Sequence, residues 1–150
     1  MKEIDEITGD VLGAALRLHR ELGPGLLESV YEVLLAGRLH ALGYEVATQQ
    51  IIGAEFEDIR FDAAFRADIL IDGRLVVEIK SVERLLPVHS KQLLTYLRLM
   101  KQPVGLFINF GGETLKEGVR RIVNDYNPSA PPLSSPRLRV NNPSSSSGAS

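Results

Sequence analysis

Two apolar segments separated by a tight-turn dipeptide constrain the fold of this chain most strongly. Residues 61–71 and 75–80 carry a strong strand pattern, and Asp72-Gly73 between them is a short-range signal for a β-hairpin. Because side chains alternate across a strand, Glu78 and Lys80 point to one face while their apolar neighbours enter the core. A carboxylate and an ammonium group near the end of an apolar strand are costly unless they pair or bind a ligand.

The loop of this hairpin decides whether Asp68, which interrupts the first apolar segment, meets Glu78. A two-residue loop would leave Asp68 and Glu78 on opposite faces of the sheet. A three-residue loop over 72–74 would set the two residues directly opposite one another, with Cβ atoms about 5 Å apart. We therefore predict an odd-numbered loop or a bulge, since that separation suits a shared Mg²⁺ ion held by carboxylate oxygens.

The chemistry that this arrangement favours is phosphodiester hydrolysis. Mg²⁺ on Asp68, Glu78 and the Ile79 carbonyl would activate a water molecule, and Lys80 would orient that water or stabilise the pentacoordinate phosphorus. Taken alone, the pattern D-x9-E-x-K favours a structural ion pair. Its position on adjacent strands of an apolar hairpin makes the metal site and the ion pair equally compatible with the sequence. The ion-pair alternative predicts that replacing Asp68 and Lys80 together leaves stability almost unchanged or improved.

The remaining elements follow from periodicity and from breaker residues. Apolar residues at spacings of three and four predict a helix over 4–22, which Gly23-Pro24-Gly25 ends. A second helix is predicted over about 26–42, with an apolar face made of Leu27, Val30, Tyr31, Leu34, Leu35 and Leu39. Strands are predicted over 44–51 and 104–110, and a helix over about 88–101. Residues 115–124 fit a helix or an edge strand, and we favour the strand. The order α-α-β-β-β-α-β-β predicts an α/β fold with a mixed central sheet flanked by helices.

Composition limits the setting and the domain organisation. At 150 residues without an apolar run of membrane length, the chain is predicted to form one domain over 1–126 and to be cytoplasmic. The absence of cysteine excludes disulfides and cysteine-ligated zinc or iron–sulfur clusters. Residues 127–150 are rich in proline and serine and are predicted to be a disordered tail. A net charge of −2 argues against a general nucleic-acid coat protein, which is usually basic.

Four further positions have both a plain and a functional interpretation. Gln92 and Tyr96 are four residues apart on the helix after the hairpin, so they share one face; a tyrosine beside a hydrogen-bonding neighbour is also ordinary. Glu28 falls in the first turn of its helix, where the helix dipole favours a carboxylate in any case. His89 precedes Gln92 closely enough to assist it, although a histidine near a helix start is commonly a cap.

Several motifs in order resemble a known family. They are Gly25-x-x-Glu28-x-x-Tyr31, Arg66-Ala67-Asp68, Glu78-Ile79-Lys80, Pro87-Val88-His89, the run from Gln92 to Arg98, and Asn109-Phe110-Gly111. Over about residues 5–125 the chain resembles the bacterial GxxExxY family of the PD-(D/E)xK nuclease superfamily. The resemblance implies a restriction-endonuclease-like core αβββαβ. It also implies that Asp68, Glu78 and Lys80 form the metal-and-lysine core, that Gln92 and Tyr96 match the Q-x-x-x-Y element of the RecB-like branch, and that Glu28 completes the metal site.

Two functional hypotheses follow. The first is a Mg²⁺- or Mn²⁺-dependent deoxyribonuclease, in which Gln92 joins the catalytic residues, and Gln92, Tyr96 and His89 contact the DNA. The second is a catalytically silent module with the same fold that binds nucleic acid or a protein partner, or forms a homodimer. Metal titration separates the two hypotheses.

Overall fold

The amphipathic helices and the strands of the sheet assemble into a three-layer α/β structure. The computed structural model describes residues 2–124, so the predicted 127–150 tail lies outside the described residues. The elements in chain order are α1 (Ile4–Leu22), α2 (Glu28–Ala41), β1 (Val46–Phe56), β2 (Ile59–Ile71), β3 (Leu75–Lys80), α3 (Pro87–Met100), β4 (Val104–Asn109), a short 3₁₀ turn (Lys116–Gly118) and β5 (Val119–Val123). The predicted order of elements is confirmed, with boundaries that shift by a few residues. The largest extension is in β1, which ends at Phe56 and not at the predicted Ile51.

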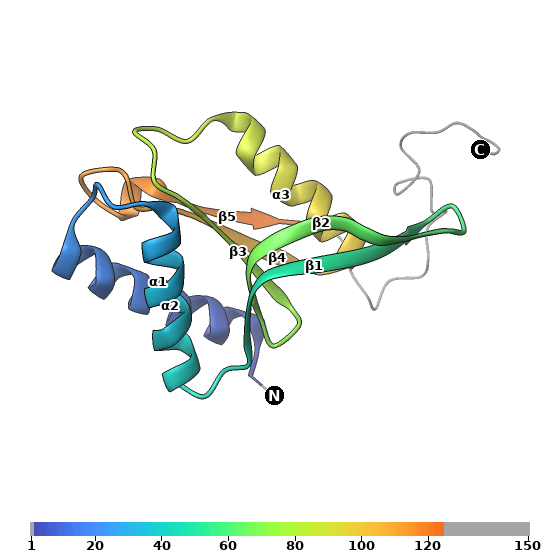
Figure 1. Ribbon diagram of the computed structural model, residues 1–150, viewed down its shortest axis with the longest axis horizontal. Coiled ribbons are helices and arrows are strands. Elements are labelled where there is room, and N and C mark those ends of the chain that lie inside the picture. The colour runs from blue at the N-terminus through green and yellow to red at the C-terminus, as the bar shows by residue number, and fades with distance from the viewer. Residues whose placement is uncertain (1, 125–150) are drawn as a thin grey trace.

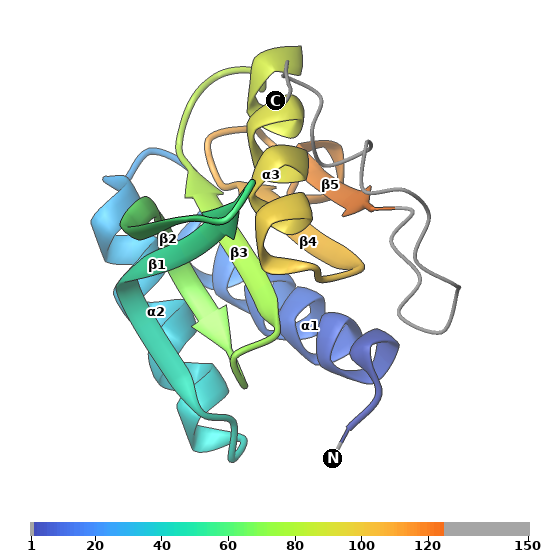
Figure 2. The same ribbon diagram turned by 90° about the vertical axis from the view of Figure 1, so that its right-hand side faces the viewer.

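The central sheet is mixed, as predicted. Its five strands lie in the order β1-β2-β3-β4-β5, and only β3 and β4 run parallel. Helices α1 and α2 cover one face and α3 covers the other (Figures 1 and 2). The 115–124 segment is a short 3₁₀ turn followed by an edge strand, in agreement with the strand interpretation.

Two apolar clusters hold these layers together. The larger cluster joins α1 and α2 to the sheet through Val77 and Ile79, and the smaller one joins α3 to the opposite face through Val76. Alternation along β3 therefore divides its apolar side chains between the two cores. No helix within residues 2–124 has the length and the apolar character that crossing a membrane requires.

The β2–β3 hairpin has the predicted odd-numbered loop. Ile71 pairs with Leu75, Leu70 with Val76 and Ile69 with Val77, which leaves a three-residue loop over 72–74. Asp72 and Gly73 both adopt the left-handed conformation, with φ of 53° and 66°. This register brings Asp68 and Glu78 to equivalent positions at the end of the ladder.

The prediction for the apolar face of α2 is wrong in half of its residues. Tyr31, Leu35 and Leu39 are buried, but Leu27, Val30 and Leu34 are exposed, Leu27 to 75%. The physical reason is that α2 packs against the sheet and α1 along one side only. Six apolar positions cover a wider stripe than that contact can bury.

The hairpin of β1 and β2 is longer than the rest of the sheet and projects beyond it as an arm (Figure 1). Its turn is formed by Glu57 and Asp58, both left-handed, with φ of 52° and 64°. Near the base of the arm, Phe65 and Ala67 pack on the α3 side, whereas Ile69 packs on the side of α1 and α2. In a regular strand these three odd-numbered residues would share one face. Close to Asp68, therefore, the odd-numbered side chains of β2 switch from the α3 layer to the layer of α1 and α2.

Candidate active site

The carboxylates of Asp68 and Glu78 occupy a fork between two diverging strands. The ladder between β2 and β3 ends at Ile69 and Val77. Beyond it, Glu78 Oε2 accepts a hydrogen bond from the Asp68 N–H at 3.0 Å, and Asp68 Oδ2 accepts one from the Ile79 N–H at 2.9 Å. Each carboxylate thus satisfies a peptide group of the opposite strand where backbone pairing has stopped. This reciprocal pair fixes two acidic side chains beside one another.

Burial makes Glu78 an unusual carboxyl group. Its side chain is only 8% exposed, on a strand whose other side chains are mostly apolar. Burial, together with the neighbouring Asp68 carboxylate, raises the pKa of Glu78 to about 8, although the Asp68 N–H and Lys80 act in the opposite direction. A buried carboxyl group with a raised pKa either keeps its proton or, once ionised, needs a nearby positive charge in place of the proton.

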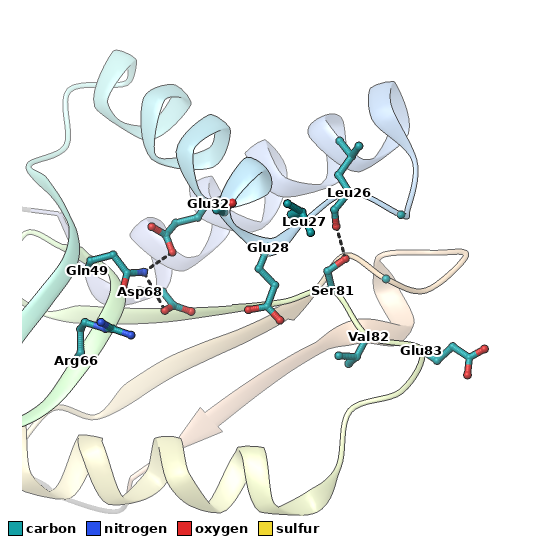
Figure 3. A pocket seen from close by; sticks show the side chains of 13 residues that line it. Leu26, Leu27, Glu28, Glu32, Gln49, Arg66, Asp68, Ser81, Val82 and Glu83 are labelled. Atoms are coloured by element: carbon teal, nitrogen blue, oxygen red, sulfur yellow. Dashed lines mark hydrogen bonds between the residues drawn. The ribbon is translucent and has the colours of Figure 1, made fainter.

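An open cavity of about 910 Å³ adjoins the fork (Figure 3). Its walls come from the start of α2, from β1 and β2, and from the segment after β3; the lining residues are Gly25, Leu26, Leu27, Glu28, Ser29, Glu32, Gln49, Arg66, Asp68, Ser81, Val82, Glu83 and Gly111. Glu28, the first residue of α2, extends from one wall, and Asp68 lies on the other (Figure 3). The cavity therefore brings Glu28 and Asp68, which are predicted site residues, to one solvent-open space.

The Gly25-x-x-Glu28-x-x-Tyr31 motif has a clear structural basis. Tyr31 is buried, and its hydroxyl donates to the Gly23 carbonyl at 2.6 Å and accepts from the Leu26 N–H at 3.2 Å. Gly25, with φ of 108°, adopts a conformation that only glycine reaches readily. Tyr31 therefore ties down the loop that precedes Glu28, and this loop sets the position of Glu28 at the cavity.

The opposite rim of the cavity is held by Asn109 at the end of β4. Its side chain is 3% exposed; it accepts from the Val82 N–H at 2.9 Å and the Gly111 N–H at 3.0 Å, and donates to the Val82 carbonyl at 2.8 Å. A Cβ on Gly111 would lie 2.3 Å from the Val82 carbonyl oxygen, so only glycine fits there. Ser81 then donates to the Leu26 carbonyl at 2.7 Å, which links this rim to the loop before α2 (Figure 3).

Helix α3 approaches the fork from the other face of the sheet. The Tyr96 ring stacks on Phe65 with centroids 3.9 Å apart. Burial raises the pKa of Tyr96, and the Glu78 and Asp68 carboxylates add to this effect, so Tyr96 lies within their electrostatic reach. Gln92 is exposed one turn earlier on α3, and neither Gln92 nor Tyr96 lines the cavity of Figure 3.

His89 is the third residue of α3, and its side chain caps the start of that helix. Its Nδ1 accepts a hydrogen bond from the Leu86 N–H at 3.1 Å, and its ring lies 5.8 Å from that of Phe107. Because Nδ1 is the acceptor, the neutral ring carries its proton on Nε2. The interpretation of His89 as a helix cap accounts for these contacts.

The donors at the fork match a hard divalent cation in kind, because Asp68, Glu78 and Glu28 all offer carboxylate oxygens. Lys80 is half-buried at the end of β3 and is close enough to lower the pKa of Glu78. Across residues 2–124, however, no three acidic or histidine side chains are gathered closely enough to hold a metal ion as they stand. Glu28, exposed at the N-terminus of α2, is a further carboxylate that lines the adjoining cavity.

Sequence reasoning missed two residues of the cavity lining, Gln49 and Glu32, of which Gln49 contacts Asp68. Gln49 Nε2 donates to Glu32 Oε1 at 2.7 Å and to Asp68 Oδ1 at 3.3 Å. Glu32 had a signal in the sequence, because it lies one helical turn after Glu28 and must share its face. Gln49 had none, since its position depends on an irregularity in β1.

Comparison with known proteins agrees with the fold. A family model described as the PD-(D/E)XK nuclease superfamily matches residues 5–122. Neither curated proteins nor solved structures give a match.

Proposed function

Because this chain belongs to the PD-(D/E)XK nuclease superfamily, we propose that it is a divalent-metal-dependent deoxyribonuclease whose site is the fork between β2 and β3. The five-stranded mixed sheet with flanking helices is consistent with the restriction-endonuclease-like fold. Nucleases of this superfamily typically use divalent metals. The finer assignment to the GxxExxY family and the RecB-like branch is part of the proposal, and it is supported by the cavity that Glu28 and Asp68 share.

One observation carries the proposal: Asp68 and Glu78 meet in the fork, each bonded to a peptide N–H of the other's strand. This arrangement orients two carboxylates in advance of binding, and one of them is buried at a cost that a cation would offset. Asp68 and Glu78 would hold Mg²⁺ or Mn²⁺ with the Ile79 carbonyl, and Glu28 would complete the set from α2. The ion would supply an activated water and neutralise charge on the phosphate.

The chain's own side chains then have distinct roles. Lys80, on the same face of β3 as Glu78, would place its ammonium group beside the negative charge that develops on the phosphate. Gln92 and Tyr96 would contact the substrate from α3, and His89 would support them at the start of that helix. Asp68 and Glu78 would keep their orientation throughout, because their second oxygens stay bonded to the backbone.

The test is a cleavage assay with labelled single- and double-stranded DNA, and RNA of the same sequence, in Mg²⁺ or Mn²⁺. We expect wild type to cleave DNA, EDTA to stop cleavage, and Asp68→Asn to lower the rate at least about 100-fold. The matched control is Asp58→Asn at the exposed tip of the arm, which tolerates asparagine in a left-handed turn and should cleave like wild type.

Three outcomes would contradict the proposal. Wild-type cleavage no faster than that of Asp68→Asn would remove the fork from the chemistry. Cleavage of RNA alone would refute the assignment to DNA. Absence of both cleavage and metal binding, with DNA or a protein partner still bound, would establish the silent module, which the lack of a preassembled acidic cluster within residues 2–124 favours.

A further inference from the structure

Gln49 is the one residue of β1 that departs from a regular strand beside the fork. Its φ of 51° lies in the left-handed region, which a residue other than glycine rarely adopts. Thr48 pairs with Ile69 and Gln50 pairs with Ala67, but no regular pair joins Gln49 to Asp68 between them. Backbone strain of this kind persists where surrounding contacts require it, and it gathers at functional sites.

The contacts of the Gln49 side chain show what that conformation achieves. The amide Nε2 donates to Asp68 Oδ1 at 3.3 Å and to Glu32 Oε1 at 2.7 Å (Figure 3). The shorter bond is the one to Glu32, a buried residue on α2. This bond holds the Gln49 amide against α2, and the same amide nitrogen also reaches Asp68 on β2. A primary amide has two N–H groups, and here each has its own carboxylate.

This bond completes the orientation of Asp68. Asp68 Oδ2 is held by the Ile79 N–H and Oδ1 by Gln49, so neither oxygen rotates freely. An ionised carboxylate has about four acceptor positions, and two hydrogen bonds leave the others open for a ligand. Partners of this type commonly orient metal ligands, and their loss typically weakens metal binding about 10–100-fold.

We propose that Gln49, anchored by Glu32, is a positioning residue that orients the Asp68 carboxylate for divalent-cation binding. This inference rests on the proposed function of the fork. Gln49 itself touches neither the ion nor the substrate; it acts through Asp68. The left-handed backbone of Gln49 places its amide between two carboxylates, that of Glu32 on α2 and that of Asp68 on β2.

The experiment is a Mn²⁺ titration of the full chain by calorimetry, with wild type, Gln49→Asn and Gln50→Asn. Asparagine tolerates the left-handed conformation and keeps an amide, but it is one methylene too short to span Glu32 and Asp68. Gln50 is the matched control, because within residues 2–124 its amide donates to the adjacent Ile51 carbonyl and to no acidic side chain. We expect the Mn²⁺ dissociation constant to rise about 10–100-fold in Gln49→Asn and to stay within twofold in Gln50→Asn.

A second readout separates positioning from general damage. In Gln49→Asn, DNA cleavage at saturating Mn²⁺ should recover to within about threefold of wild type, while the Mn²⁺ concentration needed for half of that rate rises with the dissociation constant. The melting temperature without metal should change little. Wild-type affinity in Gln49→Asn, or cleavage that excess Mn²⁺ does not restore, would overturn the inference.

Variants at Glu32 keep the test decisive if Gln49→Asn folds poorly. Glu32→Gln removes the charge but keeps an acceptor oxygen for Gln49, whereas Glu32→Met removes both. We expect Glu32→Met to weaken Mn²⁺ binding at least fivefold more than Glu32→Gln, and equal effects would overturn the inference. Failure of wild type to bind Mn²⁺ would instead refute the proposed function, so the two failures are distinguishable.

Discussion

At the scale of single residues, the proposed cation site contains a carboxyl group, that of Glu78, which is buried before any ligand binds. Glu78 has a pKa of about 8 in the folded chain, raised from an ordinary value of 4.5 by burial and by Asp68. Such a group binds a proton more tightly in the folded state than in the unfolded state. Between these two pKa values the folded chain therefore holds about one proton more than the unfolded chain.

The sign of the pH dependence follows from that difference. Without metal, the free energy of unfolding should fall as pH rises from about 5 to 9, by up to about 3–5 kcal/mol from Glu78. Glu78→Gln, which cannot ionise, should lose this component and become more stable than wild type at pH 9. Urea unfolding in EDTA at pH 5, 7 and 9 measures it, and parallel pH profiles for the two proteins would refute the assignment.

Residue identity alone could predict part of this site. Asp68, Glu78 and Lys80 stood out because each interrupts an apolar strand, and the loop length needed to bring Asp68 to Glu78 is the one observed. Gln49 was not predictable, since polar residues on an exposed strand carry no signal until the backbone conformation directs one of them toward Asp68 and Glu32. Its role depends on a left-handed φ that the residue type does not favour.

At the scale of elements, the site is a junction held by loop contacts. The segment after β3 and the loop before α2 form opposite rims of the cavity, and Ser81 joins them by its bond to Leu26. Asn109 fixes the first rim and Tyr31 fixes the second. The sequence indicated Tyr31 and Asn109 only as motif residues, and the structure shows that each one fixes a rim of the cavity.

The rim held by Asn109 can be tested by substitution. Asn109→Ala removes three hydrogen bonds and leaves both backbone groups of Val82 without those partners, so we expect a loss of about 2–4 kcal/mol in the free energy of unfolding. Mn²⁺ affinity should also fall, because the rim beside Glu78 and Lys80 loosens. Urea denaturation and a Mn²⁺ titration measure the two effects.

Asn124 provides the control for that prediction. It is also buried, and its amide donates to the Leu97 and Gln102 carbonyls away from the cavity. Asn124→Ala should lower stability without changing Mn²⁺ affinity. An equal loss of affinity in both alanine variants would show that Asn109 acts through general stability only.

The helix faces were less predictable than the strands. Alternation in 75–80 correctly assigned which side chains of β3 enter the core, because a sheet covered on both faces leaves little freedom. The apolar residues of α2 were assigned to one buried face, yet Leu27, Val30 and Leu34 are exposed. Periodicity identifies a helix, but the width of its buried stripe depends on neighbours that the sequence does not show.

At the scale of the whole molecule, the fold brings the site together from distant parts of the chain. Glu28 comes from α2, and Asp68 and Glu78 come from adjacent strands. Tyr96 lies on the helix of the opposite face, outside the cavity. The order of elements and the mixed sheet could be predicted, since helix and strand periods differ clearly and the hairpin has a strong turn signal. The predicted domain end at residue 126 stays a prediction, although Asn124 is still tied to the domain by its bond to the Pro103 carbonyl.

We propose above all that Asp68 and Glu78 bind one divalent cation in the fork between β2 and β3. The most direct test is anomalous diffraction from crystals of the protein soaked in Mn²⁺ at a pH above 8, where Glu78 is ionised. We expect one anomalous peak at ligating distance from both carboxylates, about 2.0–2.2 Å, and no such peak in Asp68→Asn crystals. A peak elsewhere, or an empty fork at a Mn²⁺ concentration that supports cleavage, would contradict the account.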